Sequence, residues 1–352
     1  MSLILGVDAG GTSSRALVST PGGAVVGRGL AGGGNPMALG PADAFAHLAA
    51  AVRQALAGMD PGRVEAAVVG LAGAGLLRRA AVRAAFERAF ADAGLRCAPR
   101  VVGDVAVAFA AGSASPSGTV LISGTGAIAA KIIDHEPVAL SDGFGWQLGD
   151  EGSAFWLGRA AARTAVRELA EATGRAGAGP GADRPADPAH PPRRTGPLTR
   201  LVTRHLLADG GREGPEGDGG DVVDRLAAAV QARPPLALAA LAPLVGRAAL
   251  QGDPAALGIV RRAARRLVRT ALEVHAGGGA PVVLAGSVLT SAGPVQRAVR
   301  ELLEPDAVVA VAGDGAGAAA WLALRELVTP AEAARLHAEL TRPRTTRGGP
   351  AG

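Results

Sequence analysis

Two glycine- and hydroxyl-rich clusters, each directly after an apolar run, are the strongest chemical signals in this sequence. Residues 8–13 form the first cluster and residues 123–126 the second. Glycine lets the backbone approach an anion closely, and its amides, with the Thr12 and Ser13 hydroxyls, can donate to phosphate oxygens. Asp8 could hold Mg²⁺, usually through water. An Asp-capped hairpin turn is the alternative for one cluster alone, but the recurrence favours a two-sided phosphate site.

Asp104 is the residue best suited to act as a general base. It lies between a short apolar run at 100–103 and a helical pattern that starts at residue 105. A carboxylate there could take a proton from a substrate hydroxyl, which typically contributes ~10²–10⁴-fold in rate. The alternative is a helix N-cap, because Asp accepts hydrogen bonds from free amides. Taken alone the position favours the cap, whereas the neighbouring motifs favour the base.

Two further loops carry side chains that suit a sugar. Asn35 ends a triple-glycine loop, where its amide could bond to hydroxyls or form an Asx-turn before proline. Asp150 and Glu151 stand between glycines ahead of a helical pattern, where a helix N-terminus also favours acids. Trp146 and Gln147 precede them and would offer a sugar pocket an apolar ring and a polar side chain.

Other glycine motifs permit more than one interpretation. Segments 285–288 and 313–319 each follow an apolar run, and both tight packing and the approach of a flat ring would explain their small residues. Residues 124–129 fit G-x-G-x-x-G/A, but a strand pattern follows at 128–134 where a dinucleotide site needs a helix. The sequence contains no P-loop motif.

The hydrophobic pattern predicts the elements that position these motifs. Residues 3–18 and 119–134 share one plan, a strand, a Gly/Thr turn and a returning strand. We interpret this as a duplicated β-β-β-α-β-α unit. The predicted strands are 3–8, 15–19, 24–29, 64–71, 100–103, 119–123, 128–134, 281–285 and 307–311, and the predicted helices include 41–57, 78–93, 154–171 and several within 227–276.

The composition changes between residues 173 and 221. This stretch is rich in Gly and Pro and poor in large apolar residues, so it cannot bury enough surface to order itself. Residues 198–207 could form a short helix within it. We expect an N-terminal α/β domain at 1–112, a C-terminal α/β domain at 113–324 with a flexible insert at about 174–220, and a helix with a disordered tail at 325–352.

Charge and composition exclude several classes of protein. The net charge is +5 over 352 residues, Arg is spread along the chain, Tyr is absent and aromatic residues are 3%. Few rings are available to stack on bases, so we expect no nucleic-acid partner. Cys97 is the only cysteine, so one chain can form neither a disulfide nor a cysteine-ligated cluster. With no signal peptide pattern and no membrane span, we expect a cytoplasmic protein.

In chain order these segments resemble the BadF/BadG-type ATPase family, in particular its N-acetylglucosamine and glucosamine kinases, within the superfamily of actin, sugar kinases and heat-shock chaperones. The similarity runs from Leu3 to about Leu324, except for the insert. Its segments are GVDAGGTSSRA, GGGNP, GLAGAG, VVGDVAVAF, LISGTGAIA, LGDEGSAFWLG, VLAGSV and GDGAGAAAWLAL. LGDEGSAFWLG is an especially specific match.

The resemblance implies a duplicated ribonuclease-H-like, actin-like ATPase fold, with two α/β domains, an interdomain cleft, and ATP and Mg²⁺ as cofactors. Asp104 would accept the proton of the 6-hydroxyl, and Asp8 would hold Mg²⁺ through water. The implied ATP-binding residues are Gly10, Gly11, Thr12, Ser13, Gly124, Thr125, Gly126, Gly286, Ser287, Gly315 and Ala316. The implied substrate-binding residues are Asn35, Ala74, Gly75, Asp104, Trp146, Gln147, Asp150 and Glu151.

One departure bears on the choice of sugar. Relatives that bind the N-acetyl sugar often read G-W-G-x-x-L-G-D-E-G, whereas residues 143–150 here read Gly-Phe-Gly-Trp-Gln-Leu-Gly-Asp. A free 2-amino group is often protonated near neutral pH and would attract Asp150 or Glu151. We therefore expect glucosamine as substrate, with N-acetylglucosamine or another hexose as the alternative and a homodimer as the family-based expectation.

Two other classes are disfavoured. ATPases that activate dehydratases carry an iron–sulfur cluster across a dimer, and one cysteine per chain supplies only two of four thiolate ligands. A sugar-sensing repressor would need a DNA-binding element, for which the sequence leaves no room before the first strand.

Overall fold

The computed structural model of the chain describes residues 2–173, 195–208, 221–275, 277 and 279–343. Most of the predicted Gly/Pro-rich insert and the end of the predicted disordered tail lie outside these residues. The short helix expected within the insert is present as α6 (Pro197–Ala208).

The first sheet is built from the N-terminal part of the chain. Its order is β3-β2-β1-β4-β5, with β1–β2 and β2–β3 antiparallel and β1–β4 and β4–β5 parallel. The apolar run of β1 is buried on both faces, as expected for a central strand. The strands are β1 (Leu3–Ala9), β2 (Ser14–Ser19), β3 (Val25–Ala31), β4 (Val64–Leu71) and β5 (Arg100–Gly103).

The second sheet repeats this topology strand for strand. Its order is β10-β9-β6-β7-β8, again with two antiparallel pairs on one side of the first strand and two parallel pairs on the other. The duplicated unit predicted from the sequence is therefore confirmed. The strands are β6 (Gly118–Ser123), β7 (Ala127–Ile133), β8 (Glu136–Asp142), β9 (Pro281–Ala285) and β10 (Val308–Val311).

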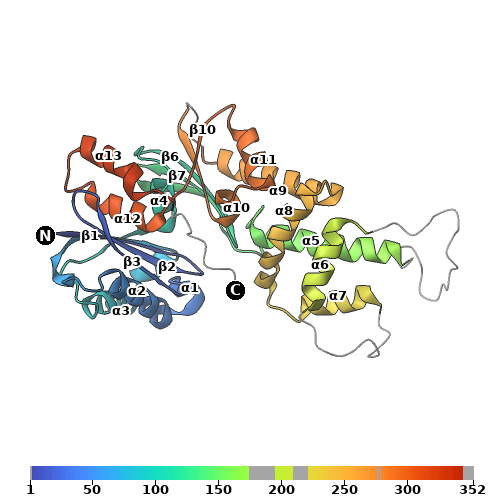
Figure 1. The fold of residues 1–352 in the computed structure, drawn as a ribbon, viewed down its shortest axis with the longest axis horizontal. Helices are drawn as coiled ribbons and strands as arrows, with labels where there is room; N and C mark the ends of the chain where they lie inside the picture. The colour runs from blue at the N-terminus through green and yellow to red at the C-terminus, as the bar shows by residue number, and fades with distance from the viewer. Residues whose placement is uncertain (1, 174–194, 209–220, 276, 278, 344–352) are drawn as a thin grey trace.

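Two corresponding helices pack against each other between the sheets. Helix α4 (Asp104–Ala110) follows β5 and packs on both sheets, against β4 and β5 as well as β6 and β9. Helix α12 (Gly315–Leu324) follows β10 but packs on β1 and β4. The contact of α12 is very close, because a Cβ on Gly6 would lie 2.1 Å from the Ala320 backbone nitrogen. In Figure 1 the red α12 and α13 (Pro330–Leu340) accordingly lie beside the blue N-terminal strands.

The remaining helices cover the outer faces of the two sheets. Helix α2 packs on β1 to β3 and on α3, and α9 packs on β6 to β8. Helices α5 to α7 lie on the right of Figure 1, and α8 packs between them and α9. Their bounds are α1 (Pro36–Leu39), α2 (Pro41–Ala55), α3 (Ala80–Ala91), α5 (Ala154–Ala172), α7 (Val222–Gln231), α8 (Ala242–Leu250), α9 (Pro254–Leu272), α10 (Ser287–Thr290) and α11 (Pro294–Leu303), with 3₁₀ segments η1 (Pro61–Arg63), η2 (Ala74–Arg78) and η3 (Pro235–Leu241).

No single helix among the described residues has the length and apolar character needed to cross a membrane. One pair, Val222–Gln231 with Pro235–Leu250, reaches that threshold together but is bent by 118° at its break.

Candidate active site

The two glycine clusters form equivalent hairpin turns. In the first, the Gly10 amide donates to the Ser13 carbonyl at 3.0 Å, and in the second the Gly124 amide donates to the Gly126 carbonyl at 2.9 Å. A Cβ on Gly11 or Gly124 would meet nothing within 4 Å, so the backbone at these positions borders open space. Both turns therefore leave room for a ligand against the main chain.

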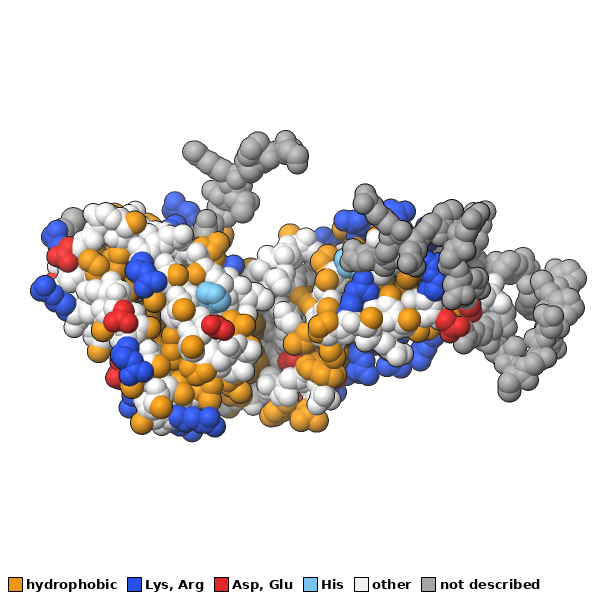
Figure 2. Space-filling model, turned by 90° about the horizontal axis from the view of Figure 1, so that it is seen from below, with side chains coloured by type: hydrophobic (Ala, Val, Ile, Leu, Met, Phe, Trp, Pro, Cys, Tyr) orange, Lys and Arg blue, Asp and Glu red, His pale blue; other side chains and the backbone are white. Residues whose placement is uncertain are grey.

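Both turns line one cavity of about 700 Å³ whose walls come from both halves of the chain. On the face seen in Figure 2, the surface is hollowed between the two main masses, and Lys and Arg occur on both of them. Of the residues predicted from the sequence, the cavity is lined by Asp8, Gly10, Gly11, Thr12, Ser13, Asn35, Asp104, Gly124, Thr125, Gly126, Asp150, Gly286, Ser287 and Gly315.

Asp8 lies near the end of β1, where the first sheet meets α12. A Cβ on Gly315 would lie 2.3 Å from Asp8 Oδ2, so any residue other than glycine at position 315 would displace the Asp8 carboxylate. The pKa of Asp8 is raised to about 6, chiefly by burial; Arg15 opposes the shift, and the carboxylates of Asp104 and Asp314 add to it. Asp8 is thus an acid whose ionised form would gain from a nearby cation.

Asp104 is the first residue of α4, and the N-cap is Gly103. Burial raises the pKa of the Asp104 carboxyl, and hydrogen bonds from the backbone at Val105 and Asp104 partly offset this. The carboxyl is therefore more basic than an exposed Asp, as proton abstraction requires. The N-cap alternative of the sequence analysis is therefore wrong, because Gly103 occupies that position, and the Asp104 carboxylate meets first-turn amides and lines the cavity.

Asn35 has a structural role as well as a place in the cavity wall. It is the N-cap of α1, and its Oδ1 accepts from the Met37 amide at 2.8 Å. The Asx-type turn weighed in the sequence analysis is therefore present. The side-chain NH₂ group is the part left for a ligand.

Asp150 connects the second hairpin to the loop that precedes α5. Its Oδ1 accepts from the Ala127 amide at 2.9 Å, and a Cβ on Gly126 would lie 2.7 Å from the same oxygen. The start of α5 also holds the hairpin, because the Ala154 amide donates to the Gly124 carbonyl at 2.8 Å. The turn is thus fixed from outside while its inner side faces the cavity.

Six predicted residues do not line this cavity. Trp146 packs edge-on against Phe155, with ring centroids 5.5 Å apart, beside a separate hollow of about 350 Å³. Glu151 forms an ion pair with Arg266 of α9, and Gln147 is exposed. The other three are Ala74, which lines another hollow, Gly75, which is exposed, and Ala316, which is buried in α12.

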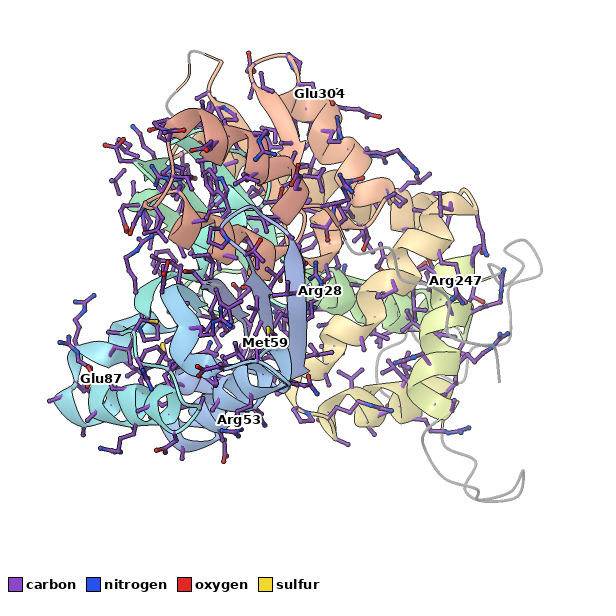
Figure 3. The ribbon with its side chains drawn as sticks, turned by 60° about the vertical axis from the view of Figure 1, so that its left-hand side comes forward. Arg28, Arg53, Met59, Glu87, Arg247 and Glu304 are labelled. Carbon is purple, nitrogen blue, oxygen red and sulfur yellow. The ribbon has the colours of Figure 1, made fainter. Side chains whose placement is uncertain are left out.

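Three polar residues around the cavity were not predicted. Arg15 lies directly opposite Asp8 in the β1–β2 pair and lines the cavity. Asp314 is the N-cap of α12 and forms an ion pair with Arg28 of β3, which Figure 3 shows near the centre of the molecule. Asp142, at the end of β8, holds the loop that contains Asp150. The strand register could have pointed to Arg15, whereas the Arg28–Asp314 pair joins segments 286 residues apart and the Asp142 contacts depend on how the 143–150 loop folds.

The residues present fit a magnesium nucleotide. The open space beside the backbone of the two glycine turns suits phosphate oxygens. The raised pKa of Asp8 indicates that the nearby side chains do not neutralise the charge of its carboxylate, which a cation would do. No group of three or more metal-ligating side chains occurs among the described residues, so a cation here would keep water ligands.

Comparisons with known proteins agree with this geometry. The model of the BadF/BadG/BcrA/BcrD ATPase family matches residues 5–312. A candidate N-acetylglucosamine kinase from Chromobacterium violaceum superposes with a TM-score of 0.64 at 23% identity, over 92% of this chain and 99% of that one. A candidate N-acetylglucosamine kinase from Porphyromonas gingivalis gives 0.59 at 19% identity, over 96% and 99%. No curated protein matches significantly. The structural likenesses establish the fold.

Proposed function

The chain belongs to the BadF/BadG/BcrA/BcrD ATPase family, and we propose that it is an ATP-dependent sugar kinase. In our proposal it transfers the γ-phosphoryl group of ATP to the 6-hydroxyl of glucosamine. The observation that carries the proposal is that two glycine hairpins and the carboxylate of Asp104 line one cavity. Donors for phosphates and a base for an alcohol are the parts that phosphoryl transfer requires.

The two hairpins bind and align the phosphates of ATP. Amides of the 10–13 turn and of the 124–126 turn donate to phosphate oxygens from the two halves of the chain, with the Thr12, Ser13 and Thr125 hydroxyls. Gly286 and Ser287 line the same cavity and, in this proposal, would contact the adenosine part of ATP. Asp8 would hold Mg²⁺ through water, and the ion would neutralise charge that develops on the phosphates.

Asp104 acts on the acceptor. It takes the proton of the sugar 6-hydroxyl while the oxygen bonds to the γ-phosphorus and the bond from that phosphorus to the bridging oxygen breaks. ADP leaves with the electron pair of that bond, and the proton remains on the carboxyl until it passes to solvent. Most of the acceleration comes from alignment and charge stabilisation, because phosphoryl transfer needs little covalent help from the protein.

The proposed sugar is supported by two other polar side chains that line the cavity with Asp104. Asn35 offers donors to hydroxyls, and Asp150 offers a carboxylate to a protonated 2-amino group. The alternative is N-acetylglucosamine, the sugar in the names of the two structural relatives. The activator class of this family remains disfavoured, because Cys97 is the only cysteine.

The direct test is sugar-dependent ADP release by the purified protein. Glucosamine, N-acetylglucosamine and glucose are offered separately with Mg·ATP, and turnover is measured at saturating nucleotide. We expect the highest kcat/KM with glucosamine. A preference for N-acetylglucosamine would transfer the assignment to the alternative sugar, and no stimulation by any of the three would refute the sugar kinase.

A further inference from the structure

We propose that Asp142 is a positioning residue that closes the base of the 143–150 loop and thereby fixes Asp150 in the cavity. The expected effect of Asp142 on sugar turnover rests on the proposed function, whereas its expected effect on the loop does not. The contacts that carry it come from the structure of the loop. Asp142 itself does not line the cavity.

The carboxylate of Asp142 accepts three backbone hydrogen bonds from both ends of the loop. Oδ1 accepts from the Gly143 amide at 2.8 Å and from the Asp150 amide at 2.7 Å, and Oδ2 accepts from the Glu151 amide at 2.9 Å. A side chain at the last residue of β8 thus ties the start of the loop to its end. Charge-assisted bonds of this kind are stronger than those between neutral groups.

The backbone at both ends of the loop adopts an unfavourable conformation, which the hydrogen bonds of the Asp142 carboxylate stabilise. Asp142 has φ +63° and Asp150 has φ +58°, a left-handed conformation that few side chains adopt at low cost. Gly149 fits between them only because it lacks a side chain, since its Cβ would lie 2.0 Å from Asp142 Oδ1. The close fit indicates that the loop has one closed geometry, which the carboxylate defines.

Residues at the end of the loop also hydrogen-bond to the second phosphate hairpin, so the position of the loop affects the position of the hairpin. Asp150, whose amide is held by Asp142, accepts from the Ala127 amide at the first residue of β7. Ser123 at the other strand of the hairpin donates from its hydroxyl to the Gly152 carbonyl at 3.2 Å. Loss of the Asp142 carboxylate would therefore release Asp150 and loosen the wall of the cavity at the sugar side.

The loop also presents apolar side chains to solvent beside the cavity. Phe144 is 72% exposed and Leu148 is 84% exposed, and Gly143 of the same loop lines the cavity. These two exposed side chains cannot order the loop by burial, so its shape depends on the packing of Trp146 against Phe155 and on the hydrogen bonds at its base. This is the physical reason for assigning the positioning role to Asp142.

The test compares Asp142→Ala and Asp142→Asn with Asp134→Ala. Asp134 is a matched control, because it lies at the other end of the same strand pair, also has positive φ, and is exposed. We expect Asp142→Ala to lower kcat/KM for the sugar about 10- to 100-fold, as displacement of a positioning group does. KM for the sugar should rise more than KM for ATP, and Asp142→Asn should recover much of the loss because its oxygen still accepts from the Gly143 and Asp150 amides.

Hydrogen–deuterium exchange gives a readout that does not depend on activity. Peptides covering 143–151 should exchange faster in Asp142→Ala than in the wild type and in Asp134→Ala, with Asp142→Asn between them. If Asp142→Ala does not fold, Gly149→Ala serves instead, because its Cβ displaces the carboxylate while Asp142 remains. Unchanged exchange in the loop, or equal rises of both KM values without recovery by Asn, would overturn the proposal. Absence of any sugar turnover in the wild type would refute the kinase and leave the exchange result to decide the role of Asp142.

Discussion

Gly315→Ala is expected to impair magnesium-nucleotide use, although the change adds one methyl group. The new Cβ would lie 2.3 Å from Asp8 Oδ2. This is about 1 Å closer than ordinary van der Waals contact, so either the helix or the carboxylate must move. Helix α12 cannot easily give way, because Gly6 holds it against β1 and a Cβ on Gly317 would lie 1.8 Å from the Leu340 carbonyl oxygen.

The carboxylate of Asp8 should therefore shift by about 1 Å, which can cost ~10²-fold in rate, or about 2.7 kcal/mol of transition-state stabilisation. The assay measures kcat/KM for Mg·ATP at saturating sugar, together with the affinity for ADP with and without magnesium. Gly293→Ala is the control, because Gly293 also stands at a helix start and the nearest atom to its Cβ is 3.7 Å away. A Gly315→Ala protein with wild-type kcat/KM and an unchanged magnesium response would refute this account of Asp8.

Three further predictions concern the cation, the ion pair between Arg28 and Asp314, and pH. Asp8→Asn should weaken ADP binding in the presence of magnesium and leave the magnesium-free affinity nearly unchanged, and an equal loss in both conditions would contradict the role of Asp8. Arg28→Ala leaves the Asp314 side chain, which is 3% exposed, without its cation, so the free energy of unfolding should fall by about 1–3 kcal/mol in urea titrations; a loss below ~0.5 kcal/mol would contradict a structural role. Burial lowers the pKa of His135 from 6.5 to about 4, so the unfolded chain binds more protons at this group, and His135 alone should lower stability by roughly 2–3 kcal/mol from pH 7 to pH 4. The raised pKa of Asp8 acts in the opposite direction over the same range, so the contribution of His135 is read as the difference between the pH profiles of the wild type and of His135→Asn, which tolerates the positive φ. Identical pH profiles for the two proteins would contradict the prediction.

Local sequence patterns were sufficient to predict most of the fold. The strand–turn–strand runs around Gly10 and Gly124 predicted the duplication, because period and turn chemistry act within a few residues. Strand β8 was implied by the repeat but was not placed by its own residues. Its exposed positions Val138 and Leu140 give an edge strand without a clear buried face.

Contacts between distant segments explain what the sequence did not show. Nothing local indicates that α12 crosses to the first sheet, so the neighbourhood of Asp8 and Asp314 was not foreseen. Trp146 was expected to lie at the sugar, but its ring finds an apolar partner in Phe155 and lines another hollow. The pairing of Glu151 with Arg266 likewise depends on how α9 packs beside the loop.

The most direct test of the central claim is phosphoryl transfer to glucosamine by the wild type and by Asp104→Asn. The product is followed by mass spectrometry, and ADP affinity is measured by calorimetry on both proteins. We predict glucosamine 6-phosphate from the wild type, a rate lower by about 10²–10⁴-fold in Asp104→Asn, and similar ADP affinity, because the amide keeps the shape of the acid but cannot take the proton. Equal rates in the two proteins would contradict the assignment of Asp104 as the base.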